Sequence, residues 1–327
     1  MLFCIKYGIL QEKALSFASA DGAKAKKGLQ GLPKALLQGK EKTMKFGVSS
    51  YSFSAYQKAS GCDDFALCDL AKEIGFDGIE FTDLNPERTG SSTEEEAALK
   101  LREKCEAIGL PIFAYTVSAN FLNGDMAGME AQICHKLDVA KILGVPLLRH
   151  DAAWSLPLGM SWEMGIEEMA PAIRRVAAYG ESLGIRTCTE NHGYLYQAPE
   201  RVLKLIQTVD HKNYGWLFDV GNFTCADTNA LVALPMALPY VFHVHAKDMI
   251  IKGTDCIPPS GMNTGTGVQY WRGTILGHGQ VPVVQAIKGL HKGGYKGSVS
   301  LEFEGPEDCL SSVRYGYEYL SRIAESL

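Results

Sequence analysis

The stretch MAGMEAQICHKLDVAKILGVPLLRH at residues 126–150 contains one complete unit of the pattern that decides the fold. Apolar residues at spacings of three and four predict an amphipathic helix over Met126–Leu143. Gly144 follows, and a glycine at this place ends a helix by adopting the left-handed backbone conformation. The apolar run Pro146–His150 then predicts a short buried strand. Helix, glycine and strand in this order are typical of the repeat of an α/β protein.

The same unit recurs from residue 45 onward. Further helices are predicted over Asp63–Ile74, Thr93–Ile108, Trp162–Leu183 and Pro199–Val209. Strands are predicted at Lys45–Ser50, Asp77–Phe81, Pro111–Val117, Pro146–His150, Ile185–Glu190, Tyr214–Asp219, Val241–Ala246 and Ser298–Phe303. Eight such strands, with no G-x-G-x-x-G after the first, favour a single-domain (β/α)8 TIM barrel over residues 44–327 rather than an open sheet.

Two segments depart from this repeat. Residues 1–43 carry eight lysines and three acidic residues, including the low-complexity stretch DGAKAKKG, and we interpret them as a disordered extension or a mis-called translation start. A mitochondrial transit peptide is the alternative, and the absence of arginine disfavours it. Residues 249–280 form a long segment rich in Gly, Thr and Pro beside the predicted active site, where a lid, a contact to a partner or a passive insertion all fit.

The composition excludes several classes of protein. No apolar stretch approaches the roughly 20 residues that a membrane span needs. The nine cysteines are scattered without a C-x-x-C pair, so we expect neither a disulfide framework nor a cysteine zinc site, and we expect a cytoplasmic protein. Residues 44–327 contain 24 basic and 34 acidic residues, a net charge of −10, which disfavours nucleic acid as a partner.

Four apolar runs in the second half of the chain end in a residue of the metal-ligand type: Glu190, Asp219, His245 and Glu302. In Ser298–Glu304 the even positions are Ser, Ser, Glu and Glu while the odd ones are apolar, so one face of this strand carries two carboxylates. A buried carboxylate is costly unless it is paired or bound to a metal. Oxygen donors and one imidazole suit one divalent ion, for which we expect manganese (Mn²⁺), with Mg²⁺, Co²⁺ or Zn²⁺ as alternatives.

Residues 44–327 resemble the sugar phosphate isomerase/epimerase family, which shares its barrel with xylose isomerase and with endonuclease IV. The matching motifs are GFDGIEF (75–81), ENHG (190–193), FDVGN (218–222), HVHAKD (243–248) and GYKGSVSLEFEG (294–305). The resemblance implies that Glu190, Asp219, His245 and Glu302 ligate the metal. It also implies carbohydrate chemistry by proton abstraction next to a carbonyl, for which we assign Glu190 and Glu302 as base and acid.

Other residues are candidates for contact with a sugar or polyol substrate. They are His192, His150, Lys247, Glu80, Asn222 and Trp271. Three of them also have a plain structural interpretation: a solvent-exposed loop residue for His192, an ion pair with Asp248 or Glu304 for Lys247, and core packing for Trp271. His243, which precedes His245 by two positions, is expected to lie deeper and to hydrogen-bond a ligand residue.

The sequence leaves three alternatives to an isomerase or epimerase. Ketose 3-epimerases carry a histidine where this chain has Asn222, and the H-x-H-x-K-D pattern is more similar to inosose dehydratase, so a lyase acting on a keto-inositol or keto-glycoside is the first alternative. An endonuclease IV-type repair enzyme is disfavoured by Asn222 and by the negative charge. A non-catalytic barrel that binds a sugar is the third. The long segment 249–280 leaves room for a homo-oligomer or a partner subunit.

Overall fold

The structure, a computed structural model, describes residues 44–327. The interpretation of residues 1–43 as an extension or a mis-called start lies outside the described residues. Among the residues that the structure describes, no helix is both long enough and apolar enough to cross a membrane.

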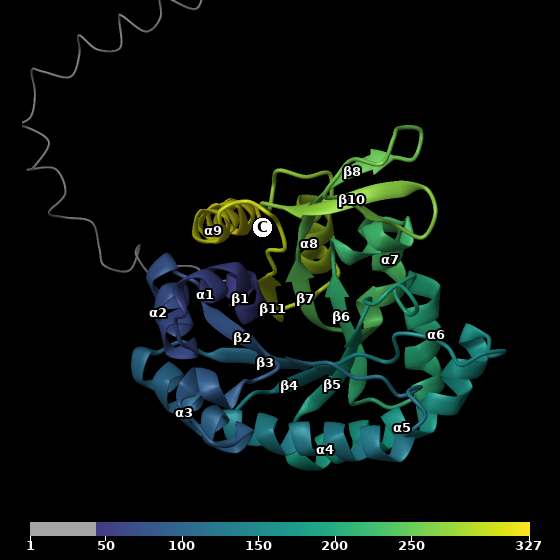
Figure 1. Cartoon of the computed structure of the whole chain (residues 1–327), viewed down its shortest axis with the longest axis horizontal. Coiled ribbons are helices and arrows are strands. Elements are labelled where there is room, and N and C mark those ends of the chain that lie inside the picture. The colour runs from purple at the N-terminus through teal and green to yellow at the C-terminus, as the bar shows by residue number, and fades with distance from the viewer. Residues whose placement is uncertain (1–43) are drawn as a thin grey trace, which may run out of the picture. The chain divides into compact units, whose positions relative to one another are not determined.

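Eight parallel strands close into a barrel, with the first strand paired to the last (Figure 1). They are β1 (Lys45–Ser49), β2 (Gly78–Thr82), β3 (Ile112–Val117), β4 (Leu147–His150), β5 (Arg186–Glu190), β6 (Tyr214–Asp219), β7 (Val241–Ala246) and β11 (Ser298–Leu301). Every predicted strand is present, with ends displaced by at most two residues. The prediction of a single-domain TIM barrel is confirmed.

Helices surround the barrel (Figure 1). They are α1 (Ser54–Ser60), α2 (Asp64–Ile74), α3 (Glu94–Ile108), α4 (Met126–Leu143), α5 (Trp162–Leu183), α6 (Pro199–Val209), α7 (Ala230–Ala237), α8 (Val283–Lys292) and α9 (Cys309–Glu325). Short polar side chains begin several of them; the hydroxyl of Ser161, for example, accepts a hydrogen bond from the backbone N–H of Met164. Gly144 and Gly184 end α4 and α5 with φ of 81° and 75°, as the repeat predicts.

The interior of the barrel changes from apolar to polar along the strands. One inward-facing layer consists of Ala114, Leu147, Cys188 and Leu217, which pack together and are almost wholly buried. Side chains alternate along a strand, so the residues two positions further on face the same interior. Those residues are Thr116, Arg149, Glu190 and Asp219. The strands therefore place their polar side chains toward their carboxyl ends, where barrel active sites lie.

The segment after β7 contains a small antiparallel sheet where the sequence suggests only an irregular loop. It consists of β8 (Asp248–Gly253), β9 (Asn263–Thr264) and β10 (Gln269–Thr274), with β10 paired to both others (Figure 1). The short strands are separated by Gly-, Thr- and Pro-rich turns, which dominate the local composition. Trp271 lies on β10 opposite Ile251 and Asn263 and is 7% exposed, packed against the hydrophobic core.

Candidate metal centre and active-site cavity

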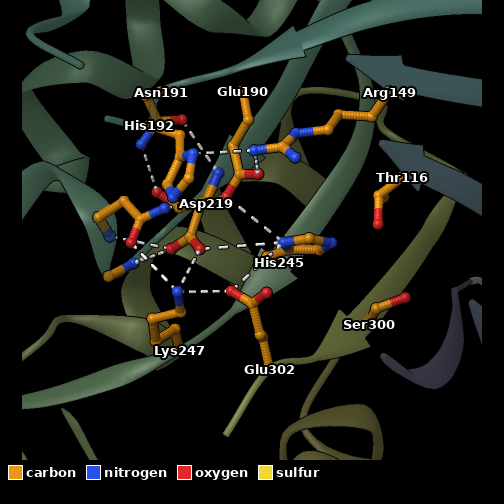
Figure 2. Close-up of polar contacts among 12 residues, drawn as sticks. Thr116, Arg149, Glu190, Asn191, His192, Asp219, His245, Lys247, Ser300 and Glu302 are labelled. Atoms are coloured by element: carbon orange, nitrogen blue, oxygen red, sulfur yellow. Dashed lines mark hydrogen bonds and ion pairs between the residues drawn. The ribbon is translucent and has the colours of Figure 1, made fainter. Parts of the chain in front are cut away.

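The ends of β5, β6 and β7 and the residue after β11 bring four side chains of the metal-ligand type together (Figure 2). Glu190, Asp219, His245 and Glu302 each offer one ligand atom, and these atoms lie within 4.8 Å of one another. Nδ1 of His245 lies 3.5 Å from a Glu190 oxygen, 3.6 Å from a Glu302 oxygen and 3.9 Å from an Asp219 oxygen. These are the four residues that the sequence predicts as metal ligands.

Four atoms of this cluster have no hydrogen-bond partner among the described residues: Oδ2 of Asp219, Nδ1 and Nε2 of His245, and Oε2 of Glu302. The ammonium of Lys247 forms ion pairs with both oxygens, but Nδ1 of His245 faces only carboxylates. Buried polar atoms are normally satisfied, and carboxylate oxygens with an imidazole nitrogen form a donor set suited to a divalent cation. The residues present therefore fit a divalent metal.

The loop after β6 orients the Asp219 carboxylate. Its Oδ1 accepts hydrogen bonds from the backbone N–H groups of Gly221 (2.7 Å) and Asn222 (2.9 Å), which turns Oδ2 toward the cluster. A Cβ on Gly221 would stand 2.9 Å from both Cβ and the carbonyl oxygen of Lys247, so only glycine allows this loop to approach β7 so closely. This close approach explains why the FDVGN motif has a glycine at position 221.

Asn222 connects two charged residues of the site. Its Nδ2 donates to Oε1 of Glu190 at 2.9 Å, and its Oδ1 accepts from Nζ of Lys247 at 3.2 Å. Asn222 is 3% exposed and is not among the residues that line the cavity beside the cluster. The structure therefore places it behind Glu190 and Lys247.

The electrostatics of the cluster favour an added cation. Burial raises the pKa of Asp219 to about 7, against the opposing effect of Lys247. Burial also opposes ionisation of Glu190, but Arg149 and His245 outweigh it and hold its pKa at about 2. The pKa of Glu302 lies well below its usual range because Lys247 and His245 outweigh burial. Glu190 and Glu302 thus stay ionised, and their negative charge opposes ionisation of Asp219. A divalent metal among the three carboxylates would stabilise the ionised form of all of them.

Arg149 is a member of the site that sequence reasoning did not single out. Its Nη2 lies 2.6 Å from Oε2 of Glu190, 2.7 Å from Oδ1 of Asp151 and 3.1 Å from Nδ1 of His192. The guanidinium is almost fully buried and lines the cavity. The sequence did contain one signal for Arg149. Side chains alternate along a strand, so Arg149 and its neighbour His150 must face opposite sides of β4 and only one of them can face the interior of the barrel.

His150, a predicted substrate contact, faces away from the cavity. Its ring stacks on Tyr214 at 5.7 Å between centroids and lies 5.5 Å from Phe121, and Nδ1 contacts the backbone oxygen of Asp151 at 2.8 Å. The imidazole is wholly buried, and burial lowers its pKa to about 4. The inward position at this level of β4 belongs to Arg149 instead.

The other predicted substrate contacts fall into two groups. His192 and Lys247 line the cavity, whereas Glu80, Asn222 and Trp271 do not. Glu80 is wholly buried on β2 and contacts the two histidines of β7. Trp271 of β10 packs against the hydrophobic core, and its neighbour Arg272 forms an ion pair with Glu307 at 3.3 Å.

The cavity beside the cluster has a volume of about 440 Å³. Its lining is strongly polar and comes from several strand ends: Tyr51, Ser54, Thr82, Asp83, Arg88, Thr116, Ser118, Arg149, Asp151, Glu190, His192, His245, Lys247, Glu302 and Glu304. Hydroxyl groups gather at the ends of β2 and β3, whereas Arg149, Glu190, His245, Lys247 and Glu302 lie at the ends of β4, β5, β7 and β11 or directly after them. Such a lining suits a small ligand that carries several hydroxyl groups.

Comparison with curated proteins finds a distant relative. An uncharacterized protein of Methanocaldococcus jannaschii is 23% identical over 176 residues, which cover 53% of this chain and 54% of that protein. The aligned part thus spans about half the length of the curated relative.

Several solved structures share the fold. The IOLI protein with a bound zinc atom has a TM-score of 0.69 and 17% identity, covering 86% of this chain and 99% of that one. The probable 3-DHS dehydratase AsbF of Bacillus anthracis, involved in petrobactin synthesis, has a TM-score of 0.68 and 18% identity, covering 85% and 99%. An L-ribulose 3-epimerase has a TM-score of 0.66 and 16% identity, covering 86% and 95%. At these identities the likeness shows the fold alone.

A family-level comparison is more extensive. The sequence model of the xylose isomerase-like TIM barrel matches residues 68–322, a range that contains all four candidate metal ligands. The resemblance stated from the sequence motifs is thereby confirmed, and the chain belongs to the xylose isomerase-like TIM barrel family.

Proposed function

We propose that this protein is a divalent-metal-dependent isomerase or epimerase that acts on a sugar or sugar-like polyol by moving a proton at a carbon next to a carbonyl. One observation carries the proposal: Glu190 and Glu302 belong to the candidate metal cluster and also line the cavity. A pair of carboxylates at this place is what proton abstraction and return require.

A divalent cation held by Glu190, Asp219, His245 and Glu302 would supply polarisation of the substrate carbonyl. The two glutamates approach the cavity from different strands, Glu190 from the end of β5 and Glu302 from just after β11. Both carboxylates are held ionised, so either can accept a proton from the substrate. The other glutamate can then act on the opposite face of the substrate. Arg149 and Lys247 hold the two carboxylates through contacts of 2.6 and 2.5 Å.

The cavity supports a small-molecule substrate. Its volume of about 440 Å³ lies within the usual range for small-ligand sites, and hydroxyl-bearing residues such as Tyr51, Thr82 and Ser118 offer hydrogen bonds to a polyol. We accordingly propose a carbohydrate-type substrate rather than nucleic acid or a membrane. Mn²⁺ is our first choice of metal, and the zinc atom bound in the structure of the similar IOLI protein makes Zn²⁺ the ion to compare with it.

A lyase is the second candidate, and His192 is the observation that favours it. Elimination of water from a keto-sugar begins with the same proton abstraction but needs an additional acid at the leaving hydroxyl. The imidazole of His192 lines the cavity, is 35% exposed and lies 3.0 Å from the carboxylate of Asp151. Arg149 contacts both Glu190 and His192, so His192 lies close to the base and is our candidate for the additional acid.

One screen tests both candidates. The purified protein, supplied with Mn²⁺ or Zn²⁺, is incubated in deuterated water with ketoses, keto-inositols and keto-glycosides, and deuterium at the carbon next to the carbonyl is followed by NMR. An isomerase or epimerase yields a deuterated isomer of the substrate, whereas a lyase yields a product that has lost water or an aglycone. Absence of exchange with every substrate class, in protein shown to bind metal, would refute the proposed function.

A further inference from the structure

A carboxylate lies enclosed between two histidines inside the barrel, next to the metal cluster. Glu80 projects from β2 across the interior to β7, where its Oε2 lies 2.6 Å from Nε2 of His243 and its Oε1 lies 2.7 Å from Nε2 of His245. All three side chains are at most 1% exposed, and Glu80 does not line the cavity. A role in contacting substrate therefore does not suit this residue.

The contacts determine where the imidazole protons must lie. An ionised carboxylate has no proton to donate, so a ring nitrogen 2.6 or 2.7 Å from one of its oxygens must itself carry a proton, because two lone pairs would repel at that distance. Nδ1 of His243 lies 3.0 Å from the hydroxyl of Ser298, which can donate to it. Nδ1 of His245 is then the atom left facing the carboxylates of the candidate metal cluster. A metal-bound histidine needs this arrangement, in which one nitrogen donates to an acceptor and the other presents its lone pair.

We propose that Glu80 and His243 are positioning residues that hold His245 with Nε2 protonated and Nδ1 directed at the metal. The inference rests on the metal site of the proposed function, and it assigns a role to two residues that do not contact the substrate cavity. Glu80 fixes the ring orientation of His245 directly. His243 acts through Glu80, because its own hydrogen bond occupies the second carboxylate oxygen and prevents Glu80 from turning away.

The same three residues have a competing interpretation as a second metal site, because their ligand atoms also lie close together. Glu80 forms a hydrogen bond of 2.6 Å with Nε2 of His243 and an ion-pair contact of 2.7 Å with Nε2 of His245, so each of its oxygens already has a nitrogen in direct contact. A metal between these atoms would have to replace the hydrogen bond and the ion pair and take the proton from each Nε2. The geometry therefore favours positioning, and metal stoichiometry distinguishes the two.

The first experiment uses the unmodified chain and reads the proton positions directly. In ¹⁵N-labelled protein, long-range ¹H–¹⁵N NMR is expected to show slowly exchanging Nε2–H protons on both His243 and His245. These protons should be present with and without Zn²⁺, because only Nδ1 of His245 faces the metal. Their presence in protein that binds zinc but exchanges no proton of any substrate tested would leave this inference standing while the proposed function fails. A proton on Nδ1 of His245 in the zinc-loaded protein, with none on Nε2, would overturn the inference.

The second experiment compares cobalt binding by the wild type and two variants, using calorimetry and the visible d–d absorption of Co²⁺. Glu80→Gln puts an amide NH₂ against one histidine and should weaken Co²⁺ binding about 10- to 100-fold with an altered spectrum. Asp64→Asn is the matched control, since Asp64 is also a buried carboxylate but pairs with Gln57 on α1, and its Co²⁺ affinity should equal that of the wild type.

Two results of the cobalt experiment would overturn the inference. One is wild-type affinity and an unchanged spectrum in folded Glu80→Gln. The other is binding of two Co²⁺ ions by the wild type with selective loss of one ion in Glu80→Gln, because that would make Glu80 a ligand of a second metal. If Glu80→Gln does not fold, the proton positions measured in the wild type decide the question.

Discussion

Replacing Lys247 with methionine removes the ammonium from a buried group of carboxylates. Nζ lies 2.5 Å from an oxygen of Glu302, 3.1 Å from one of Glu304 and 3.5 Å from one of Asp219, and the side chain is 5% exposed. Methionine retains an unbranched chain without the charge. We expect the metal-free variant to be less stable than the wild type and to bind a divalent metal more tightly, because the ammonium no longer competes for the same oxygens.

The magnitudes follow from the burial and the distances. Removing one partner of a buried ion pair costs about 3–5 kcal/mol of unfolding free energy. Two unit charges about 4 Å apart interact by about 4 kcal/mol at an effective dielectric constant near 20, so loss of the ammonium removes a repulsion of that order from an incoming cation. Proton uptake offsets part of this gain, since burial already raises the pKa of Asp219 to about 7. We expect a net tightening of about tenfold, or about 1.4 kcal/mol.

Urea denaturation of the metal-free proteins and calorimetric titration with Mn²⁺ measure the two effects separately. Lys136→Met is the matched control, because Lys136 of α4 is also buried and forms a 2.5 Å ion pair with Glu94, the first residue of α3, outside the cavity. The control should lose stability without a change in Mn²⁺ affinity. If Lys247→Met binds Mn²⁺ no more tightly than the wild type while the control behaves as expected, the electrostatic reasoning is refuted.

Three further outcomes are expected. Exhaustive chelation should abolish deuterium exchange into the substrate and Mn²⁺ should restore it; full exchange by protein shown to be metal-free would contradict a metal role. Glu190→Gln and Glu302→Gln should each lower the exchange rate by about 10²- to 10⁴-fold with unchanged circular dichroism, and wild-type exchange in both would exclude them as acid and base. Because burial lowers the pKa of His150 from 6.5 to about 4, the unfolded chain takes up its proton first, and stability is lost as the pH falls from 6.5 to 4. At 1.36 kcal/mol per pKa unit this loss is roughly 3 kcal/mol, so His150→Gln should flatten that part of the urea-derived stability curve, and an unchanged slope would contradict the assignment.

Much of the barrel could be predicted because its signals are local. The spacing of apolar residues in α4 and the glycine at its end act within a few residues of each other, and both appear in the structure where the sequence places them. The sequence does not predict the small sheet of β8, β9 and β10. Its strands are short, and they pair across turns whose Gly-, Thr- and Pro-rich composition is typical of an irregular loop. Trp271 consequently lies in the core, where a sequence pattern alone also allowed a place beside the substrate.

The candidate site was predictable in part for a topological reason. All strands of a parallel barrel present their carboxyl ends at one rim, so ligand-type residues at the ends of four strands must meet there. This argument brings Glu190, Asp219 and His245 together without any knowledge of distances. It does not say which of two adjacent residues faces inward, and at the end of β4 the inward residue is Arg149 rather than His150.

By itself, the sequence determined the barrel repeat, the family and the four side chains of the candidate metal cluster, because backbone alternation, helix periodicity and strand-end chemistry operate over a few residues. Only the tertiary structure decided the partners of those side chains. Glu80 and His243 are 163 residues apart in the chain and 2.6 Å apart in the barrel. Their contact depends on the closure of the barrel and on the register of strands that do not pair directly, and no local pattern carries that information.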